Sequence, residues 1–254
     1  MFSVTEAQLL EWLTPLLWPT IRVLALLAGM PVFSQRNMPM RVRVGLAVFI
    51  SLAAQPSLPA MPVVPLDNLP LLLMLLAQQL LIGLSMGFAV RLVFAALEFA
   101  GELIGLQMGL NYAGFFDPAT GSQGTASSRF FGTMVAFLFI AINGHLLLIQ
   151  AVIQSFHAFP IGQEPFAFLR AAQPQTWGAE IFRIGLWIAL PLITMLMFVN
   201  LVLGVISRVA PQINVFSVGF PLTVSVGLVG MVATLPLMQT PFSMALERLL
   251  QAFS

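Results

Sequence analysis

The chain has 254 residues, of which 59% are hydrophobic and only 7% are charged. Soluble domains carry about 25% charged residues, so this composition excludes an ordinary water-soluble fold. Ten Arg against nine acidic residues leave a net charge of +1, which excludes a basic surface for polyanions, and the absence of Cys excludes disulfides and thiolate chemistry.

Long stretches without a charged residue predict the helices. A bilayer core of about 30 Å needs roughly 20 apolar residues in a helix. The stretches cover residues 12–35 (interrupted only by Arg22), 44–66, 68–90, 130–163, 184–207 and 209–246. Runs such as 71–76 lack the alternation of a membrane barrel. We therefore predict an all-α, polytopic integral membrane protein, a single membrane domain over 1–254 with about six long helices.

Arg22 lies inside the first stretch, with apolar residues on both sides. Charges at membrane depth are costly and often functional, so one interpretation is a polar contact to a partner or a cavity. The other is that the side chain snorkels toward the basic turn at residues 36–43. The sequence leaves both open.

The connections carry prolines and arginines. Prolines between residues 56 and 65 predict an extended, rigid connector, because proline lacks the backbone donor that a helix needs. The distribution of arginines between alternate loops mildly favours an N-terminus on the outer side of the membrane.

Residues 83–87 read Gly-Leu-Ser-Met-Gly and match the G-x-S-x-G pattern of hydrolases. That pattern requires a strand–turn–helix context, whereas this one lies in a predicted helix among leucines. The two glycines instead predict a close helix–helix contact. An intramembrane serine protease pairing Ser85 with His145 remains an alternative.

Arg91, Glu98 and Glu102 share one helical face by their spacing. Two carboxylates one turn apart repel each other unless something neutralises them. This face is therefore either a solvated or subunit-facing helix end, or part of a proton or ion pathway.

A glycine-rich segment follows. Gly101, Gly105 and Gly109 recur at every fourth position, which predicts a face that another backbone approaches, either within the chain or from a partner subunit. Residues 110–125 predict a loop, yet they include two adjacent phenylalanines and a tyrosine. Irregular backbone at membrane depth must be buried or line a cavity, so this loop is a candidate gate or plug. The alternative is a surface loop with aromatic residues at the lipid headgroups.

Prolines recur through the C-terminal third. Kinked helices need neighbours to satisfy the freed carbonyls, so we expect this region to pack against protein rather than face lipid. The prolines are Pro191, Pro211, Pro221, Pro236 and Pro241.

Residues 207–221 carry the most specific pattern. They read Ser-Arg-Val-Ala-Pro-Gln-Ile-Asn-Val-Phe-Ser-Val-Gly-Phe-Pro. This resembles the R-x-x-P-Q-x-N-x-F-x-x-G-F-P signature of the FliR family of flagellar biosynthetic proteins, an export-gate family shared with virulence-type type III secretion systems. Further matches, at 101–109, 116–118, 121–123, 143–145, 155–156 and 160, follow the family order across most of the chain.

The resemblance implies an architecture and residue roles. Residues 1–179 are similar to the FliP subunit, and residues 180–254 to the helical hairpin of FliQ, so the chain would close a spiral of those subunits in a hetero-oligomeric helical gate. Loop 110–125 corresponds to the family's plug. The implied plug residues are Met108, Asn111, Tyr112, Phe115, Phe116, Asp117 and Pro118. The implied helix-packing or partner-interface residues are Gly101, Gly105, Gly109, Arg208, Pro211, Gln212, Asn214, Phe220 and Pro221.

The resemblance also implies a function. The chain would be a non-enzymatic subunit without a cofactor, in the bacterial inner membrane at the flagellar basal body, projecting to the periplasmic side. It would form and seal the channel for unfolded flagellar proteins, with FliP, FliQ, FlhA and FlhB as partners. The chain has no phosphate-binding glycine loop, so energy would come from the proton motive force and a separate ATPase. A virulence-type subunit of the same fold and an ion-coupled transporter are the alternatives.

Overall fold

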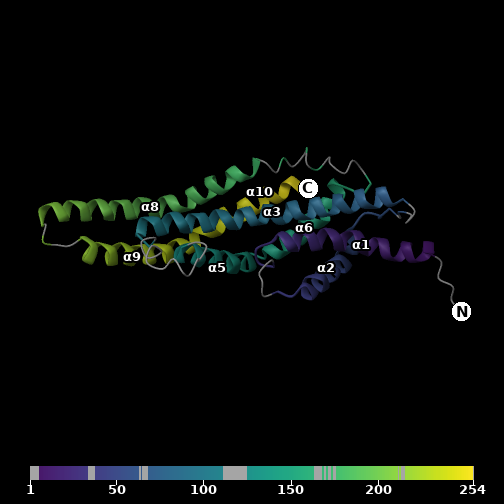
Figure 1. Cartoon of the computed structure of the whole chain (residues 1–254), viewed down its shortest axis with the longest axis horizontal. Coiled ribbons are helices and arrows are strands. Elements are labelled where there is room, and N and C mark those ends of the chain that lie inside the picture. Colours follow the sequence, from purple (N-terminus) through teal and green to yellow (C-terminus); the bar gives the residue numbers. More distant parts are fainter. Residues whose placement is uncertain are drawn as a thin grey trace. The chain divides into compact units, whose positions relative to one another are not determined.

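The computed structural model describes residues 6–33, 38–62, 64, 68–110, 125–162, 168, 170, 173, 176–210, 212 and 215–253. Every regular element within them is a helix, which confirms the all-α prediction. The helices are α1 (Glu6–Gly29), α2 (Met40–Ala54), α3 (Leu69–Met108), α5 (Ala126–Ala141), α6 (Gly144–Ala158), α8 (Gly178–Val209), α9 (Val215–Thr234) and α10 (Gln239–Leu250), with short 3-10 turns η1 (Gln55–Ser57), η4 (Leu235–Met238) and η5 (Gln251–Phe253) (Figure 1).

Four stretches of the described chain are long and apolar enough to cross a membrane, which makes the chain a polytopic membrane protein. They are Trp12–Gly29, Leu69–Met108, Gly178–Val209 and Ser217–Phe253. The pair α5 and α6 adds a fifth if it counts as one broken span.

The remaining differences from about six spans have local causes. The span predicted over 44–66 is wrong, because α2 has only 15 residues and ends at Ala54. Pro56 follows in η1 and has no N–H with which to continue the helical ladder. The stretch 130–163 is broken at Asn143, whose φ of 56° lies in the left-handed region.

Packing divides the chain into two compact units. The first comprises Met1–Leu92, Asn143–Trp177 and Leu246–Ser254, and the second comprises Val93–Ile142 and Gly178–Ala245. The boundary predicted at residue 179 rests on a resemblance to two different subunits, and it stays a prediction.

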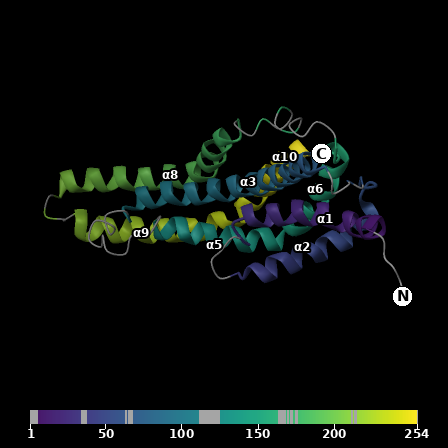
Figure 2. The same ribbon diagram turned by 45° about the vertical axis from the view of Figure 1, so that its right-hand side comes forward.

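In the first unit, α1 packs on α2 and on the N-terminal part of α3 (Figure 2). A Cβ atom on Gly83 would lie 2.7 Å from Cβ of Ala25, and one on Gly87 would lie 2.9 Å from Cα of Gly29. Only residues without a side chain permit this approach. The predicted packing role of the glycines in residues 83–87 is thereby confirmed.

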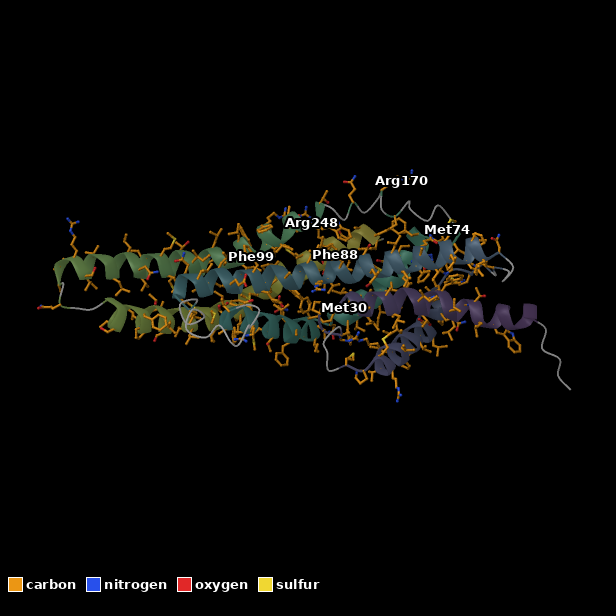
Figure 3. The ribbon with its side chains drawn as sticks, viewed as in Figure 1. Met30, Met74, Phe88, Phe99, Arg170 and Arg248 are labelled. Atoms are coloured by element: carbon orange, nitrogen blue, oxygen red, sulfur yellow. The ribbon has the colours of Figure 1, made fainter. Side chains whose placement is uncertain are left out.

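In the second unit, α8 and α9 run side by side in both views (Figure 1, Figure 2). Phe94 of α3 anchors the interior, with its ring centroid 5.8 Å from that of Phe139 and 5.9 Å from that of Phe242. Phe99, labelled in Figure 3, contacts Phe182 of α8 with ring centroids 5.4 Å apart. α3 therefore supplies aromatic contacts to α5, α8 and α10 within this unit.

The outer faces of α8 and α9 remain apolar. The side chains on α8 are mostly carbon (Figure 3), and only 28% of its most apolar 18-residue stretch is buried within the chain. The most apolar 18-residue stretch within Ser217–Phe253 is also 28% buried. The chain therefore covers only part of these helices, and their exposed faces are available to lipid or to partner subunits.

Candidate functional site

The loop predicted at residues 110–125 joins α3 to α5, and only its two ends belong to the described residues. We call these ends the loop root, defined as residues 108–110 and 125–128. Several predicted site residues lie outside the described part of the chain. They are Asn111, Tyr112, Phe115, Phe116, Asp117, Pro118, Pro211 and Asn214.

Gly109 ends α3 in a left-handed conformation, with φ of 78°. Its N–H donates to the carbonyl of Leu106 at 3.1 Å, and the N–H of Leu110 donates to the carbonyl of Gly105 at 3.0 Å. This pair of bonds is the Schellman motif, in which glycine is favoured because it has no Cβ. Gly109 therefore turns the chain out of the helix at the start of the loop.

The last two carbonyls of α3 meet polar side chains from α8 and α9. Nδ2 of Asn200 lies 3.5 Å from the carbonyl oxygen of Gln107. Oγ1 of Thr223 lies 3.4 Å from that of Met108 and 3.0 Å from that of Phe220 in its own helix. A hydroxyl has one proton, so the shorter bond is the stronger of the two. A helix leaves its last four carbonyls unpaired, and here all four have a polar neighbour.

The side chain of Met108 packs against α9. It is 1% exposed, and a Cβ atom on Gly227 would lie 2.5 Å from its Cγ and 2.6 Å from its Sδ. Thr223 and Gly227 are four residues apart and so share one face of α9. α9 thus contacts both the side chain and the carbonyl of Met108.

The glycines before the loop face α5. A Cβ atom on Gly101 would lie 2.9 Å from the carbonyl oxygen of Ser127, and one on Gly105 would overlap Oγ of Ser127. Oγ1 of Thr125 accepts a hydrogen bond from the N–H of Ser128 at 3.1 Å and caps α5. Both ends of the loop are therefore held next to each other by α3 and α5.

Four described residues of the 207–221 signature that were predicted as interface residues are exposed: Arg208, Gln212, Phe220 and Pro221. Arg208 lies in the last turn of α8, where a cation complements the helix dipole. Gln212 lies in the turn after α8, and Phe220 and Pro221 lie on α9. Their exposure leaves them available to a partner or to lipid.

Arg22 is fully buried in the first unit. Its Nε donates to Oε1 of Gln79 at 2.8 Å, Nη1 donates to Oγ of Ser155 at 2.9 Å, and Nη2 donates to the carbonyl of Phe159 at 3.1 Å. The guanidinium carbon lies 3.6 Å from the centre of the Phe156 ring, a cation–π geometry. Arg22 thus ties α1 to α3 and to the end of α6.

These contacts support neither snorkelling nor a partner contact for Arg22. The side chain neither snorkels toward residues 36–43 nor reaches a surface where a partner could contact it. It binds the carbonyl of Phe159 just after α6, and Nε2 of Gln78 lies 3.4 Å from the next carbonyl, that of Pro160. Polar side chains thus satisfy the backbone carbonyls of the two residues that follow α6. Sequence reasoning missed the partners Gln78, Gln79 and Ser155, whose only signal was their polarity within apolar runs.

The other weighed residues lie mostly at the surface. Arg91 and Glu98 are exposed, and Glu102 is half-buried. Oε1 of Glu98 would lie 2.9 Å from a Cβ atom on Gly132, so this carboxylate lies along α5. His145, proposed as a protease residue, is exposed.

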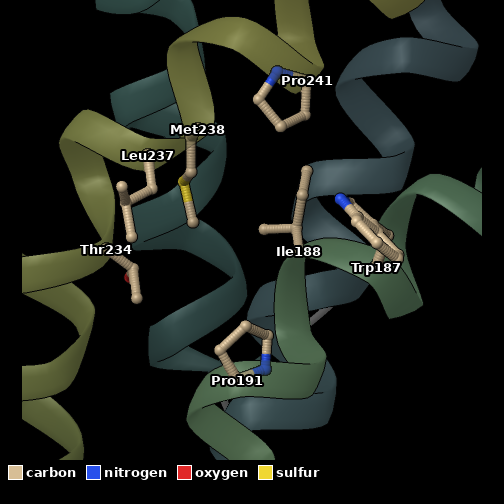
Figure 4. Close-up of a pocket in the computed structure, with 7 residues that line it drawn as sticks. All are labelled: Trp187, Ile188, Pro191, Thr234, Leu237, Met238 and Pro241. Atoms are coloured by element: carbon tan, nitrogen blue, oxygen red, sulfur yellow. The ribbon is translucent and has the colours of Figure 1, made fainter.

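An apolar pocket of about 110 Å³ lies in the second unit (Figure 4). Ile188 and Met238 in its lining are nearly buried, whereas Trp187 and Leu237 are exposed. The hydroxyl of Thr234 donates within its own helix at 3.0 Å. The pocket therefore offers shape rather than charge, and we assign it no chemistry.

Comparisons with known proteins give a consistent picture. The model of a family described as bacterial export proteins, family 1, matches residues 13–249. The chain is 46% identical over 249 residues to the flagellar biosynthetic protein FliR of Escherichia coli (strain K12), covering 95% of this chain and 92% of that protein. It is 34% identical over 233 residues to the FliR of Aquifex aeolicus (strain VF5), with 92% and 90% covered. It is 31% identical over 238 residues to that of Bacillus subtilis (strain 168), with 89% and 90% covered.

Proposed function

The chain belongs to family 1 of the bacterial export proteins and is a component of the flagellar export apparatus, and from this premise we propose that it is a core subunit of the export gate. It would form and seal the channel through which unfolded flagellar proteins leave the cytoplasm. The observation that carries the proposal is the 46% identity with the Escherichia coli FliR, which extends over 95% of the chain. The chain would act without enzymatic activity and without a cofactor.

We propose FliP and FliQ as its direct partners, FlhA and FlhB as further ones, and the inner membrane at the flagellar basal body as its location. The exposed apolar faces of α8 and α9 support a partner surface, because the chain buries only 28% of the most apolar stretch in each region. The exposed signature residues on and beside these helices would belong to that surface.

Co-expression tests this proposal. The tagged chain would be expressed with the FliP and FliQ of the same source, purified in detergent and analysed by native mass spectrometry. We expect one assembly that holds a single copy of this chain among several copies of the others. A chain that purifies alone as a well-behaved monomer would contradict the gate role, and transport by this chain alone in liposomes would favour the ion-coupled transporter. The identity of neighbouring genes would separate a flagellar from a virulence-type system.

We further propose that loop 110–125 is the plug of the closed channel. Its apolar side chains would exclude water and ions, since hydrophobic constrictions can gate by dewetting. Deleting residues 114–121 should make the assembled gate leak ions without preventing assembly. Replacing the same residues with a Gly-Ser segment of equal length separates the loss of apolar side chains from the loss of length. If membranes with either variant stay as tight as those with the unaltered chain, the plug assignment is wrong.

A further inference from the structure

We propose that Thr223 and Gly227 form a seat for Met108 on α9, and that this seat fixes the position of the loop root. They would be positioning residues, acting on the loop through Met108. The consequence for gating rests on the proposed function, whereas the seat itself rests on contacts within the second unit.

Steric fit is the first observation. A Cβ atom on Gly227 would lie 2.5–2.7 Å from Cγ, Sδ and Cε of Met108, so the thioether lies directly on the backbone of α9. Met108 is 1% exposed, which leaves its side chain little room to move aside. The absence of a side chain at residue 227 is therefore what admits Met108.

Polar contact is the second, independent observation. One turn earlier on the same face, Oγ1 of Thr223 lies 3.4 Å from the carbonyl oxygen of Met108 and is itself buried. Asn200 on α8 reaches the preceding carbonyl, that of Gln107, at 3.5 Å. Each contact is long, and the Thr223 hydroxyl also bonds to the carbonyl of Phe220 at 3.0 Å, but both contacts come from the α8–α9 pair and both end on the last turn of α3.

The place of Met108 in the chain gives the seat its effect. Met108 is the last residue of α3, and Gly109 next to it turns the backbone into the loop with a φ of 78°. A shift of Met108 on α9 therefore changes where the loop begins. In an assembled gate, a neighbouring subunit that moved α9 would move the loop root with it.

Cysteine labelling tests the seat directly, because the chain has no native Cys. Leu110→Cys places a thiol on the root, and its rate of reaction with a maleimide is measured in membranes that contain the assembled complex. Thr223→Val removes the hydroxyl at almost constant volume, and Gly227→Val displaces Met108. Losing a contact of this kind should raise local opening, and with it the labelling rate, by about fivefold.

Matched substitutions control for the general effect of altering a residue on α8 or α9. Ser225→Ala removes a hydroxyl that donates within α9 to the carbonyl of Pro221 at 2.7 Å. Gly204→Val adds a side chain on α8 where nothing lies within 4 Å. Neither should change the labelling rate, and Thr223→Ser, which keeps the hydroxyl, should restore the slow rate. Native mass spectrometry checks that each complex is intact. If the Gly227→Val complex fails to assemble, the Thr223→Val complex alone tests the seat.

Equal labelling rates in Thr223→Val, Gly227→Val and the two controls would overturn the seat. Faster labelling in the two seat variants, with rescue by Thr223→Ser, would establish it. The measurement needs no ion leak, so it is separate from the test of the plug. If the seat is established but the loop deletion does not leak, the positioning role of Thr223 and Gly227 stands and only the plug assignment is wrong.

Discussion

The buried bond between Arg22 and Gln79 allows a quantitative test. Gln79→Leu keeps the approximate volume but removes the acceptor of a hydrogen bond 2.8 Å long from a charged donor. Hydrogen bonds to charged groups contribute about 1.5–3 kcal/mol, and an unpaired buried donor costs the whole of that. We expect Gln79→Leu to lower the free energy of unfolding by about 2 kcal/mol.

Arg22→Met should cost more, because it breaks three hydrogen bonds and the contact with the Phe156 ring. Because Arg22→Met removes the charge itself, its cost comes from the buried polar groups that lose their donor, at about 1–3 kcal/mol each. In the double variant the two changed side chains are both apolar, so neither leaves the other unpaired. Its loss should therefore fall short of the sum of the single losses by about 1–3 kcal/mol.

Thermal unfolding of the purified complex measures these changes. A fluorescent tag on this chain reports the fraction that remains in the folded, monodisperse peak after heating. For a chain of this size, about 1 kcal/mol corresponds to 2–4 °C, so Gln79→Leu should lower the midpoint by about 4–8 °C. Gln150→Leu, the same substitution at an exposed position of α6, is the control and should change it little. Losses that simply add in the double variant would refute the coupling of Arg22 to Gln79.

Three glycine substitutions give further predictions. Gly87→Ala should lower the same midpoint by several degrees, since its Cβ would lie 2.6 Å from a carbonyl oxygen of α1; Gly45→Ala, with nothing within 4 Å, is the control, and equal midpoints would contradict close packing. Gly105→Leu should prevent recovery of the complex, because its side chain would overlap Ser127, and normal recovery would remove that argument. Gly109→Ala places a Cβ in the left-handed region at a cost of about 1 kcal/mol. An unchanged midpoint would mean that α3 does not end in a left-handed conformation at Gly109.

Sequence patterns within single segments predicted much of the fold. Long uncharged stretches predicted an all-helical membrane protein, because apolar composition over about 20 residues is a property of the segment alone. A close helix–helix contact at Gly83 and Gly87 was predicted from their spacing, but its partner α1 was not. The end of α2 was missed because hydropathy does not register helix termination, although Pro56 was visible in the sequence.

The clusters depended on long-range pairing, which spacing cannot reveal. Arg22 meets Gln79 at a separation of 57 residues and Ser155 at a separation of 133. Thr223 meets Met108 at a separation of 115. Taken alone, each of these polar residues could bond within its own helix. Its partner in another helix becomes visible only when the helices are packed. The roles of the plug and signature residues came from resemblance and remain predictions.

The continuity of α3 has a consequence for the life of the free chain. A helix of 40 residues that rises 1.5 Å per residue is about 60 Å long, twice the roughly 30 Å of a hydrocarbon core. A bilayer can cover only part of such a helix, so the remainder of its apolar surface must be covered by protein. A copy that has not met its neighbours would therefore expose to water the part of α3 that neither lipid nor its own helices cover, the kind of surface on which chaperones and proteases act. We expect the cellular half-life of this subunit to follow the supply of its neighbours rather than its own synthesis.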